Sequence, residues 1–368
     1  MKIKTILMSM LAVAALASCN KDEAGNAPTG STSSLEFKIA VPATMAIQDP
    51  GTATAPTLAS VKVEMLNDTT VVEIRDLTTA QITAAQAATG VVLEQIPEAA
   101  TSVKVTANGL ATPSMAIADY QTTLAAVPFS GTANITYTAG DVNTDGHKLK
   151  KAKVTIKAEV ARIEISGGIN VDKTTNGYYA VDVEEIYINN YLQTSTAPTP
   201  YLVSGSAGGF ATPNALATDK MMNTITEPTT GSFYATDHNI GVLTGKADAY
   251  QIFPAKDATA TPTVTTAAAA LPHVVLKVKV YETVEDYNGG TPMTGRKWIT
   301  IKTFKKGSEL LTEFAAGNIY KLNLNDLTNS FKPGVTPPVD PDPEDKKADL
   351  ELKVEVTPWV LVNMTPNI

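Results

Sequence analysis

Hydrophobic and polar side chains alternate along most of the chain with a period of two residues. In the first such run, Leu35, Phe37 and Ile39 would face one way and Glu36 and Lys38 the other, which is the pattern of a half-buried β-strand. Clusters of Gly, Pro, Asn and Thr separate this run from later ones, as turns require. Similar runs recur at 61–65, 102–105, 153–157, 161–165, 185–188, 274–280, 298–301 and 319–322.

Helical periodicity is rare by comparison, and only the Ala-rich stretch 78–88 predicts a short helix. Many strands with polar turns and few helices indicate an all-β chain built of antiparallel sandwiches. A length of 368 residues favours two domains. The polar stretch 141–153 divides two strand-rich halves, so we place an N-terminal β-sandwich domain at 35–150 and a C-terminal one at 151–368.

The C-terminal part of the chain has a connector and a strand-like segment. Residues 333–343 are rich in Pro and Asp and predict a stiff, extended connector. It leads to a last segment, 350–368, whose first residues alternate between apolar and polar. They predict another half-buried strand, with Leu350, Leu352, Val354 and Val356 on its apolar side.

After Pro358 this alternation stops, and the residues become apolar on both faces, at Trp359, Val360, Leu361, Val362 and Met364. A strand that is apolar on both faces needs cover on both, and an exposed one would be an aggregation-prone edge. The segment therefore either completes the core of its own domain or pairs with another chain.

The N-terminus predicts export and lipid attachment. Lys2 and Lys4 precede an apolar stretch, 6–16, that is too short to span a bilayer as a stable helix. Small residues then lead to Ser18 and Cys19, which is typical of a lipoprotein signal peptide cleaved between these two residues, with the lipid on the Cys19 thiol. We therefore expect a signal peptide at 1–18 and a small, polar, flexible tether at 19–34.

Composition excludes several classes of protein. Hydrophobic residues make up 43% and charged residues 18% of the chain, which is too apolar for disorder and too interrupted for a membrane bundle. The net charge of −8 repels nucleic acid and anionic lipid headgroups. Cys19 is the only cysteine, so no disulfide can form within one chain.

No pattern of catalytic or metal-binding residues stands out. The three histidines, His147, His238 and His273, are far apart in the sequence and lack partners at helical spacing. Residues 141–146 open like a calcium loop, but position 152, where the loop needs an acid, is Ala. We expect a polar turn there, and no cofactor, no metal and no enzymatic activity for the chain.

Two further motifs are incomplete, and one charged residue is ambiguous. Residues 241–247 are one residue short of a phosphate-binding loop, and 204–208 lack the first glycine of a nucleophile elbow. Arg162 lies among apolar residues at the start of a strand, where it could form a buried ion pair or extend its charged end to solvent. We favour the second arrangement.

Several motifs along the chain point to one family of proteins. The lipoprotein cysteine is followed by Asn, Lys, Asp and Glu, and the other motifs are the alternating first strand, the proline-rich connector, and residues 157–165, 317–322 and 356–362. Together they resemble the type V pilins, the major fimbrillins of oral and gut anaerobes. The residues after Cys19 also resemble the surface-export signal of lipoproteins in such bacteria.

The resemblance implies two tandem transthyretin-like β-sandwiches and assembly by strand exchange. A trypsin-like protease would remove the first strand of the lipidated precursor, here Leu35, Phe37 and Ile39, and open a groove. The C-terminal strand of a neighbouring subunit, here Trp359 to Met364, would fill it. The implied partners are identical or related pilin subunits, the processing protease and, for the precursor, the outer membrane; the implied location is the cell surface and then the fimbrium.

One departure from the family leaves the role of the subunit open. The family is cleaved after an arginine in the loop that follows the first strand, but residues 40–60 contain no Arg or Lys. The chain would be a polymerising shaft subunit, or an anchor or accessory subunit that keeps its lipid. A third alternative is a monomeric surface lipoprotein that binds a glycan or a host protein.

Overall fold

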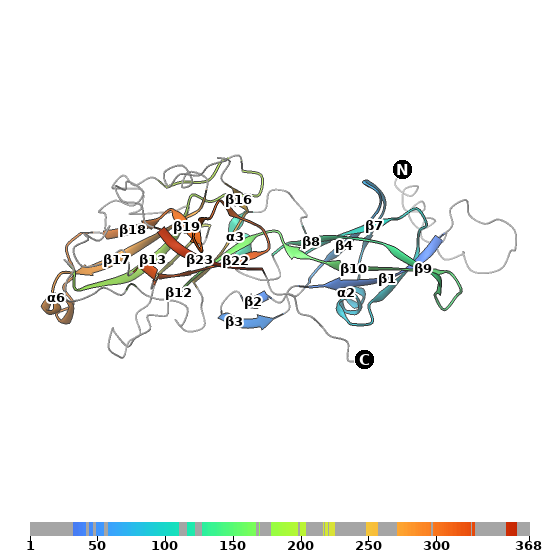
Figure 1. Cartoon of the computed structure of the whole chain (residues 1–368), viewed down its shortest axis with the longest axis horizontal. Helices are drawn as coiled ribbons and strands as arrows, with labels where there is room; N and C mark the ends of the chain where they lie inside the picture. The colour runs from blue at the N-terminus through green and yellow to red at the C-terminus, as the bar shows by residue number, and fades with distance from the viewer. Residues whose placement is uncertain are drawn as a thin grey trace, which may run out of the picture.

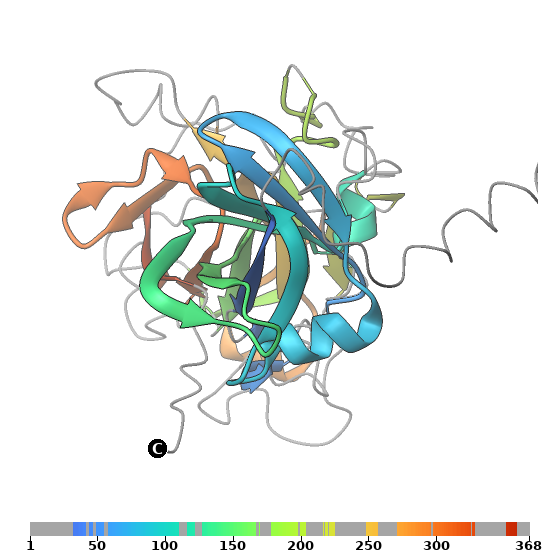
Figure 2. The same cartoon turned by 90° about the vertical axis from the view of Figure 1, so that its right-hand side faces the viewer.

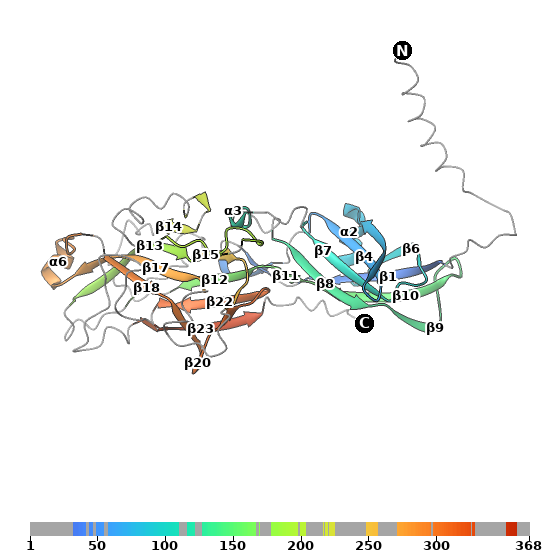
Figure 3. The same cartoon turned by 90° about the horizontal axis from the view of Figure 1, so that it is seen from above.

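The chain folds into two β-rich halves that lie end to end (Figures 1 and 3). The computed structural model describes residues 32–41, 44–46, 49–54, 58–109, 116–121, 127–166, 169, 178–197, 199–203, 216, 218–219, 221–224, 248–256, 271–295, 297–324, 326–327 and 351–358. The described part is all-β, with three short helices, α2 (Thr79–Gln86), α3 (Ile117–Tyr120) and α6 (Val284–Asn288).

Two curved sheets face each other in the N-terminal half, as Figure 2 shows along the long axis. One sheet has the order β6-β1-β10-β9 and consists of β6 (Val91–Pro97), β1 (Thr32–Ala40), β10 (Lys148–Thr155) and β9 (Thr136–Val142). The other has the order β11-β8-β7-β4-β5 and consists of β11 (Lys157–Ala158), β8 (Phe129–Asn134), β7 (Ser102–Ala107), β4 (Val61–Asn67) and β5 (Thr70–Asp76).

The C-terminal half contains two larger sheets and a small one. The six-stranded sheet has the order β15-β12-β22-β23-β19-β20: β15 (Asp248–Ile252), β12 (Ala161–Ser166), β22 (Asn318–Asn323), β23 (Glu351–Pro358), β19 (Thr303–Lys306) and β20 (Glu309–Leu310). The four-stranded sheet has the order β14-β13-β17-β18: β14 (Met222–Thr224), β13 (Ala180–Asn189), β17 (His273–Tyr281) and β18 (Lys297–Ile301). The small pair consists of β16 (Ala255–Lys256) and β21 (Glu313–Phe314).

The helix predicted at 78–88 is α2. Thr78 caps it, because its side chain accepts a hydrogen bond from the backbone N–H of Gln81 while the Gln81 side chain accepts from the backbone N–H of Thr78. This reciprocal pair satisfies two N–H groups that a helix start leaves without partners. Ile82 and Ala85 are buried, so one face of the helix joins the core.

The change of sheet partners lies further along the chain than the expected division at 150/151. Strands β10 and β11 pair with the N-terminal half, and β12, which begins at Ala161, pairs with the C-terminal half. The Lys-rich stretch is not a linker, because Lys151 and Lys153 lie on the exposed face of β10 while Ala152 and Val154 are buried. A strand with one solvated face carries such charges at alternate positions.

Several hydrogen bonds join the two halves. The backbone N–H of Ile117 donates to the Gln193 carbonyl (2.8 Å), and the Gln121 side chain bonds to both backbone groups of Gln251. The buried apolar residues of both halves also form one continuous cluster. The halves therefore pack against each other through core residues as well as polar contacts.

Candidate functional site

Strand β1 is an inner strand of its sheet, although it comes first among the described residues. It runs parallel to β10 on one side and antiparallel to β6 on the other, so both of its edges are paired. Leu35 and Phe37 are fully buried and Ile39 is 4% exposed. The alternation in the sequence therefore marks a strand that supplies three side chains to the centre of the N-terminal core.

The opposite face of β1 is charged and partly exposed. Lys38 and Glu36 form an ion pair of 2.8 Å on this face, and Glu36 lies opposite Lys151 of β10. Gly90, just before β6, has a φ of 73°, and a Cβ there would lie 2.8 Å from the Phe37 carbonyl oxygen. The left-handed backbone and this close approach to β1 both favour glycine.

The N-terminal end of β1 is held by buried hydroxyl groups. Ser33 and Ser34 are each 1% exposed, and they donate hydrogen bonds to the carboxylates of Glu98 and Glu94, respectively. Asn143, in the turn between β9 and β10, donates to the Ser34 hydroxyl (2.9 Å) and to Glu94 Oε2 (3.0 Å). We call the place that β1 occupies between β6 and β10 the β1 site. These residues, together with Lys148 and Lys150, form the polar end of this site.

The two lysines add positive charge to this polar end. Lys148 Nζ donates to Glu98 Oε1 over 2.8 Å, and the 7%-exposed Lys150 donates to the Glu98 backbone carbonyl over 2.6 Å. The hydrogen bonds from Lys148 and then from Ser33 hold the pKa of Glu98 below its ordinary value. Removal of β1 would take one of these two donors away from Glu98.

The pattern of residues along the chain does not reveal this polar end. Composition predicts a flexible tether at 19–34, but β1 begins at Thr32 and buries both serines. Hydroxylated residues before an apolar run are also typical of linkers. Only their pairing with acids more than fifty residues away, at Glu94 and Glu98, distinguishes the two cases.

The other end of β1 lies close to the junction of the two halves. The backbone N–H of Ile156 donates to the Ala40 carbonyl over 3.0 Å, and Val41 is buried. The chain then forms a hairpin of β2 (Thr44–Ala46) and β3 (Asp49–Thr54). This hairpin occupies part of the 40–60 segment, in which the sequence has no basic residue.

The strand predicted from the alternation that follows Leu350 is β23, which belongs to the sheet of its own half. It pairs antiparallel with β22, placing Pro358 opposite Asn318, and parallel with β19, placing Glu351 opposite Thr303. Val354 is 5% exposed. Up to Pro358, therefore, the C-terminal segment completes its own domain, while Trp359, Val360, Leu361, Val362 and Met364 lie outside the described residues.

Arg162 differs from the sequence expectation. The sequence favours a side chain that reaches solvent, but Arg162 is 1% exposed and its Nε donates to Glu164 Oε1 over 2.7 Å. Burial lowers the pKa of the Arg162 guanidinium, and the adjacent carboxylate opposes that effect. Both faces of β12 are covered, so the side chain forms a buried ion pair with the residue two positions along its own strand.

The remaining candidate sites are polar turns or lie outside the described residues. The 141–146 segment is the β9–β10 turn, where the Asn143 side chain accepts hydrogen bonds from the N–H groups of Asp145 and His147. Ser18, Cys19 and the 204–208 and 241–247 segments fall outside the described part of the chain. Within that part, no group of His, Cys, Asp and Glu is arranged to hold a metal ion, and no helix is long and apolar enough to cross a membrane.

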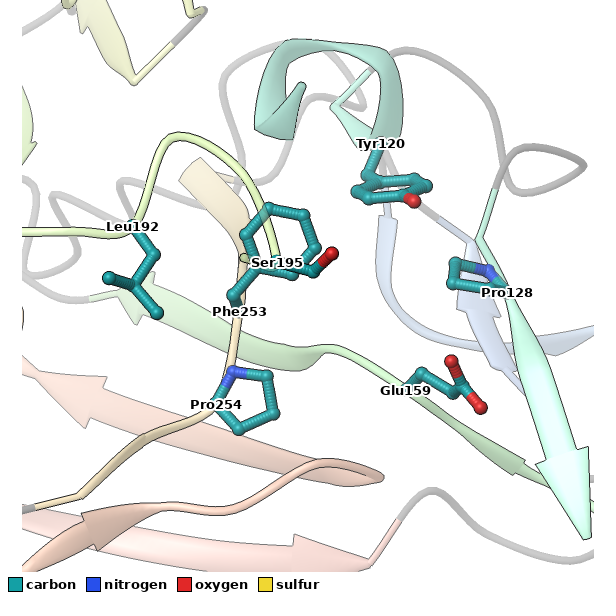
Figure 4. Close-up of a pocket in the computed structure, with 7 residues that line it drawn as sticks. All are labelled: Tyr120, Pro128, Glu159, Leu192, Ser195, Phe253 and Pro254. Atoms are coloured by element: carbon teal, nitrogen blue, oxygen red, sulfur yellow. The ribbon is translucent and has the colours of Figure 1, made fainter. Parts of the chain in front are cut away.

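A pocket of about 240 Å³ lies between the two halves (Figure 4). Tyr120 and Phe253 meet edge to face across it, with ring centroids 5.6 Å apart. Burial, and then the charges of Asp119 and Glu159, raise the pKa of Tyr120. Its lining comes from distant segments, which is why no sequence motif marks it: Tyr120, Pro128, Glu159, Leu192, Ser195, Phe253 and Pro254.

Comparisons with known proteins give matches among solved structures only. No protein-family model and no curated sequence matches the chain. A structure from Parabacteroides distasonis, described as a candidate cell adhesion protein, has a TM-score of 0.49 and 13% identity, covering 90% of this chain and all of its own. One from Bacteroides eggerthii, described likewise, has a TM-score of 0.48 and 13% identity, covering 91% and 98%.

The matches also include a fimbrial protein. The tip fimbrial protein Mfa3 of Porphyromonas gingivalis, with a C-terminal truncation, has a TM-score of 0.44 and 8% identity. The alignment covers 89% of this chain and all of that one.

Proposed function

We propose that the chain is a structural subunit of a cell-surface fimbria, exported as a lipoprotein and polymerised by strand exchange. In this proposal β1 leaves after proteolysis, and residues that follow Pro358 in a second copy take its place. The resulting filament supports adhesion. The protein acts through assembly and not through catalysis.

The observation that carries the proposal is the position of β1. A strand close to one end of the chain is paired on both edges and supplies three core side chains. Its loss would open an apolar groove between β6 and β10, with unpaired backbone groups on both walls. Leu35, Phe37 and Ile39 together account for roughly 5–9 kcal/mol of burial, an upper bound, so an empty groove strongly favours a replacement strand.

A suitable replacement strand is present in the sequence of the same chain. Residues up to Pro358 are held in their own sheet, whereas Trp359 to Met364 are apolar at nearly every position. In this arrangement each copy accepts a strand from one neighbour and gives its own strand to another, so the contacts are head-to-tail. Head-to-tail contacts that do not close into a ring produce filaments.

The test uses a specific protease site inserted after Pro42, in a chain that starts at Thr32. After cleavage we expect the protein to form ladders of polymers, whereas the uncut protein stays monomeric. The matched control carries the same site but lacks residues 359–368, and it should be folded and remain monomeric after cleavage. Equal polymerisation of this control, or its failure to fold before cleavage, would contradict the proposal.

A second candidate, a pilus anchor or accessory subunit, is favoured by the absence of Arg and Lys from residues 40–60. A subunit that is never cut keeps β1 and its lipid, so it offers a strand but accepts none. Mass spectrometry of protein taken from the cell surface distinguishes the two roles. An N-terminus at acylated Cys19 supports the anchor, and one within 40–60 supports the shaft subunit.

A further inference from the structure

We propose that the strand entering the β1 site runs in the opposite direction to β1, with Thr365 of the second copy in the place of Ser34. This inference rests on the function proposed above and adds the direction and register of the incoming segment. It follows from the polar end of the site and from the order of residues after Pro358.

The backbone of the site accepts either direction. β1 has one parallel neighbour, β10, and one antiparallel neighbour, β6. A reversed strand would be antiparallel to β10 and parallel to β6, so it would also have one neighbour of each kind. Both ladders satisfy the backbone hydrogen bonds, with little difference in stability. The side chains therefore decide the direction.

The two ends of the site differ in polarity. At the polar end, the loss of Ser33 and Ser34 removes a hydroxyl donor from each of Glu98 and Glu94. Toward the junction, the side chains around Ile39 are apolar, and Val154 and Ile156 are fully buried. Both acids reach solvent, but the places of Ser33 and Ser34 are buried beside them. An apolar side chain in either place would donate nothing to the adjacent carboxylate, whereas a hydroxyl would restore the hydrogen bond. The site therefore favours an incoming strand with a hydrogen-bond donor at this end.

The available segment has the same asymmetry along its length. The ladder between β22 and β23 extends to Pro358, so the segment proposed to enter the second copy begins at Trp359. It starts with four apolar residues and becomes polar later, at Asn363, Thr365 and Asn367. None of residues 359–368 is charged. The hydroxyl that could replace a serine therefore lies toward the later part of this segment.

When the incoming strand runs opposite to β1, its apolar start lies at the apolar end of the site and its polar residues lie at the polar end. Val360, Val362 and Met364 would occupy the places of Ile39, Phe37 and Leu35, respectively. Met in place of Leu conserves volume, which well-packed cores tolerate. Thr365 follows Met364 as Ser34 adjoins Leu35, so its hydroxyl would lie beside Glu94.

If the incoming strand ran in the same direction as β1, with the same three apolar residues in the core, the residues at its two ends would not match the site. Trp359 would occupy the place of Ser34, which is 1% exposed and bonded to Glu94 and Asn143. Thr365 would reach the place of Ala40, far from both acids. Shifting the register by two residues puts Leu361 beside Glu94 instead. In this direction, therefore, no register of residues 359–368 that keeps at least two of the three apolar side chains in the core places a hydrogen-bond donor beside Glu94.

Disulfide trapping tests the direction. The donor chain starts at Thr32, keeps β1 and carries Thr365→Cys; the acceptor carries the cleavable site after Pro42 and lacks residues 359–368. Two acceptors are compared, Leu149→Cys, which lies opposite Ser34, and Thr155→Cys, which lies opposite Ala40. Neither chain contains Cys19, so no other thiol competes.

We expect the disulfide-linked heterodimer to form at least tenfold more with Leu149→Cys than with Thr155→Cys. The opposite preference would overturn the reversed direction and leave strand exchange intact. A heterodimer seen by size-exclusion chromatography with no disulfide to either position would also overturn the inference. Absence of any heterodimer would contradict the proposed function itself.

The Thr365 hydroxyl gives a second readout that needs no cysteine in the acceptor. Thr365→Ala in the donor should weaken the heterodimer about tenfold, as expected for the loss of a hydrogen bond to a carboxylate, and Thr365→Ser should restore it. Glu94→Gln in the acceptor should reduce the difference between the Ala and Thr donors. Equal affinities of the Ala, Ser and Thr donors would overturn the register.

Discussion

At the scale of single residues, the polar end of the β1 site shows how charge and burial combine. Glu98 accepts from the Ser33 hydroxyl and from Lys148, and its backbone carbonyl accepts from Lys150. These contacts stabilise the ionised carboxylate and attach the start of β1 to the turns around it. The Glu98 side chain remains 31% exposed, so solvent screens part of its interaction with Lys148.

The lowered pKa of Glu98 predicts a pH dependence of stability. A group whose folded-state pKa is depressed stabilises the fold above its unfolded pKa, near 4.5, and that contribution is lost as pH falls through the folded-state value. We expect Glu98→Gln to reduce the free energy of unfolding by up to about 1 kcal/mol at neutral pH. Denaturant titrations at pH 7 and below pH 4 should show that the difference shrinks in acid; a difference that grows would contradict this assignment.

Gly131 shows why some residues are not predictable from local sequence. A Cβ at this position in β8 would lie 2.3 Å from the Thr155 carbonyl oxygen of β10, so the two sheets approach here at backbone distance. The sequence shows only a glycine inside a strand. The close contact depends on a segment more than twenty residues away, which pattern alone does not place.

At the scale of elements, β1 behaves as a core strand, and its inner face should dominate its energetics. Phe37 is fully buried, whereas Lys38 lies on the partly exposed face. Phe37→Ala should cost about 3–5 kcal/mol by removing a large buried side chain, and Lys38→Ala less than about 1 kcal/mol. Chemical denaturation of the uncut protein measures both, and similar losses for the two variants would exclude the inward orientation of Phe37.

The period-two pattern predicted ten strands, because side-chain alternation directly reflects a sheet with one buried face, but it missed others such as β5, β6 and β9. The Ala-rich stretch separately predicted α2. The alternation predicted the buried triplet of β1 and the alternating part of β23 for the same reason. It failed where burial does not follow the pattern. Arg162 and Glu164 are buried because both faces of β12 are covered, and Ser33 and Ser34 because distant acids bind them.

At the scale of the whole molecule, the junction of the halves was the least predictable feature. The Lys-rich stretch 148–153 marks a change in composition, but it belongs to β10, with Lys151 and Lys153 on the exposed face of that strand. The chain crosses between sheets only after Ala158. The contacts that join the halves come from short segments around α3 and the edge of β15. They depend on how the sheets pack, and no local pattern of residues encodes that.

The side chain of Gln121 makes the most specific of these contacts. Its Nε2 donates to the Gln251 carbonyl (2.6 Å), and its Oε1 accepts from the Gln251 N–H (2.9 Å). Because β15 is an edge strand, this amide takes the place of a neighbouring strand and satisfies both backbone groups. Gln251 itself is 1% exposed, so these groups cannot bond freely to water.

Gln121→Ala should therefore weaken the coupling between the halves. Two backbone groups would lose their partners, at about 1–3 kcal/mol each before any relaxation. We expect calorimetric unfolding to change from one transition into two, with the second transition nearly unmoved, and Gln121→Glu to behave similarly because a carboxylate accepts the N–H bond but supplies no donor. Thr83→Ala, on the exposed face of α2, is the matched control and should leave the profile unchanged. A single transition retained in Gln121→Ala would mean that apolar packing alone holds the halves together.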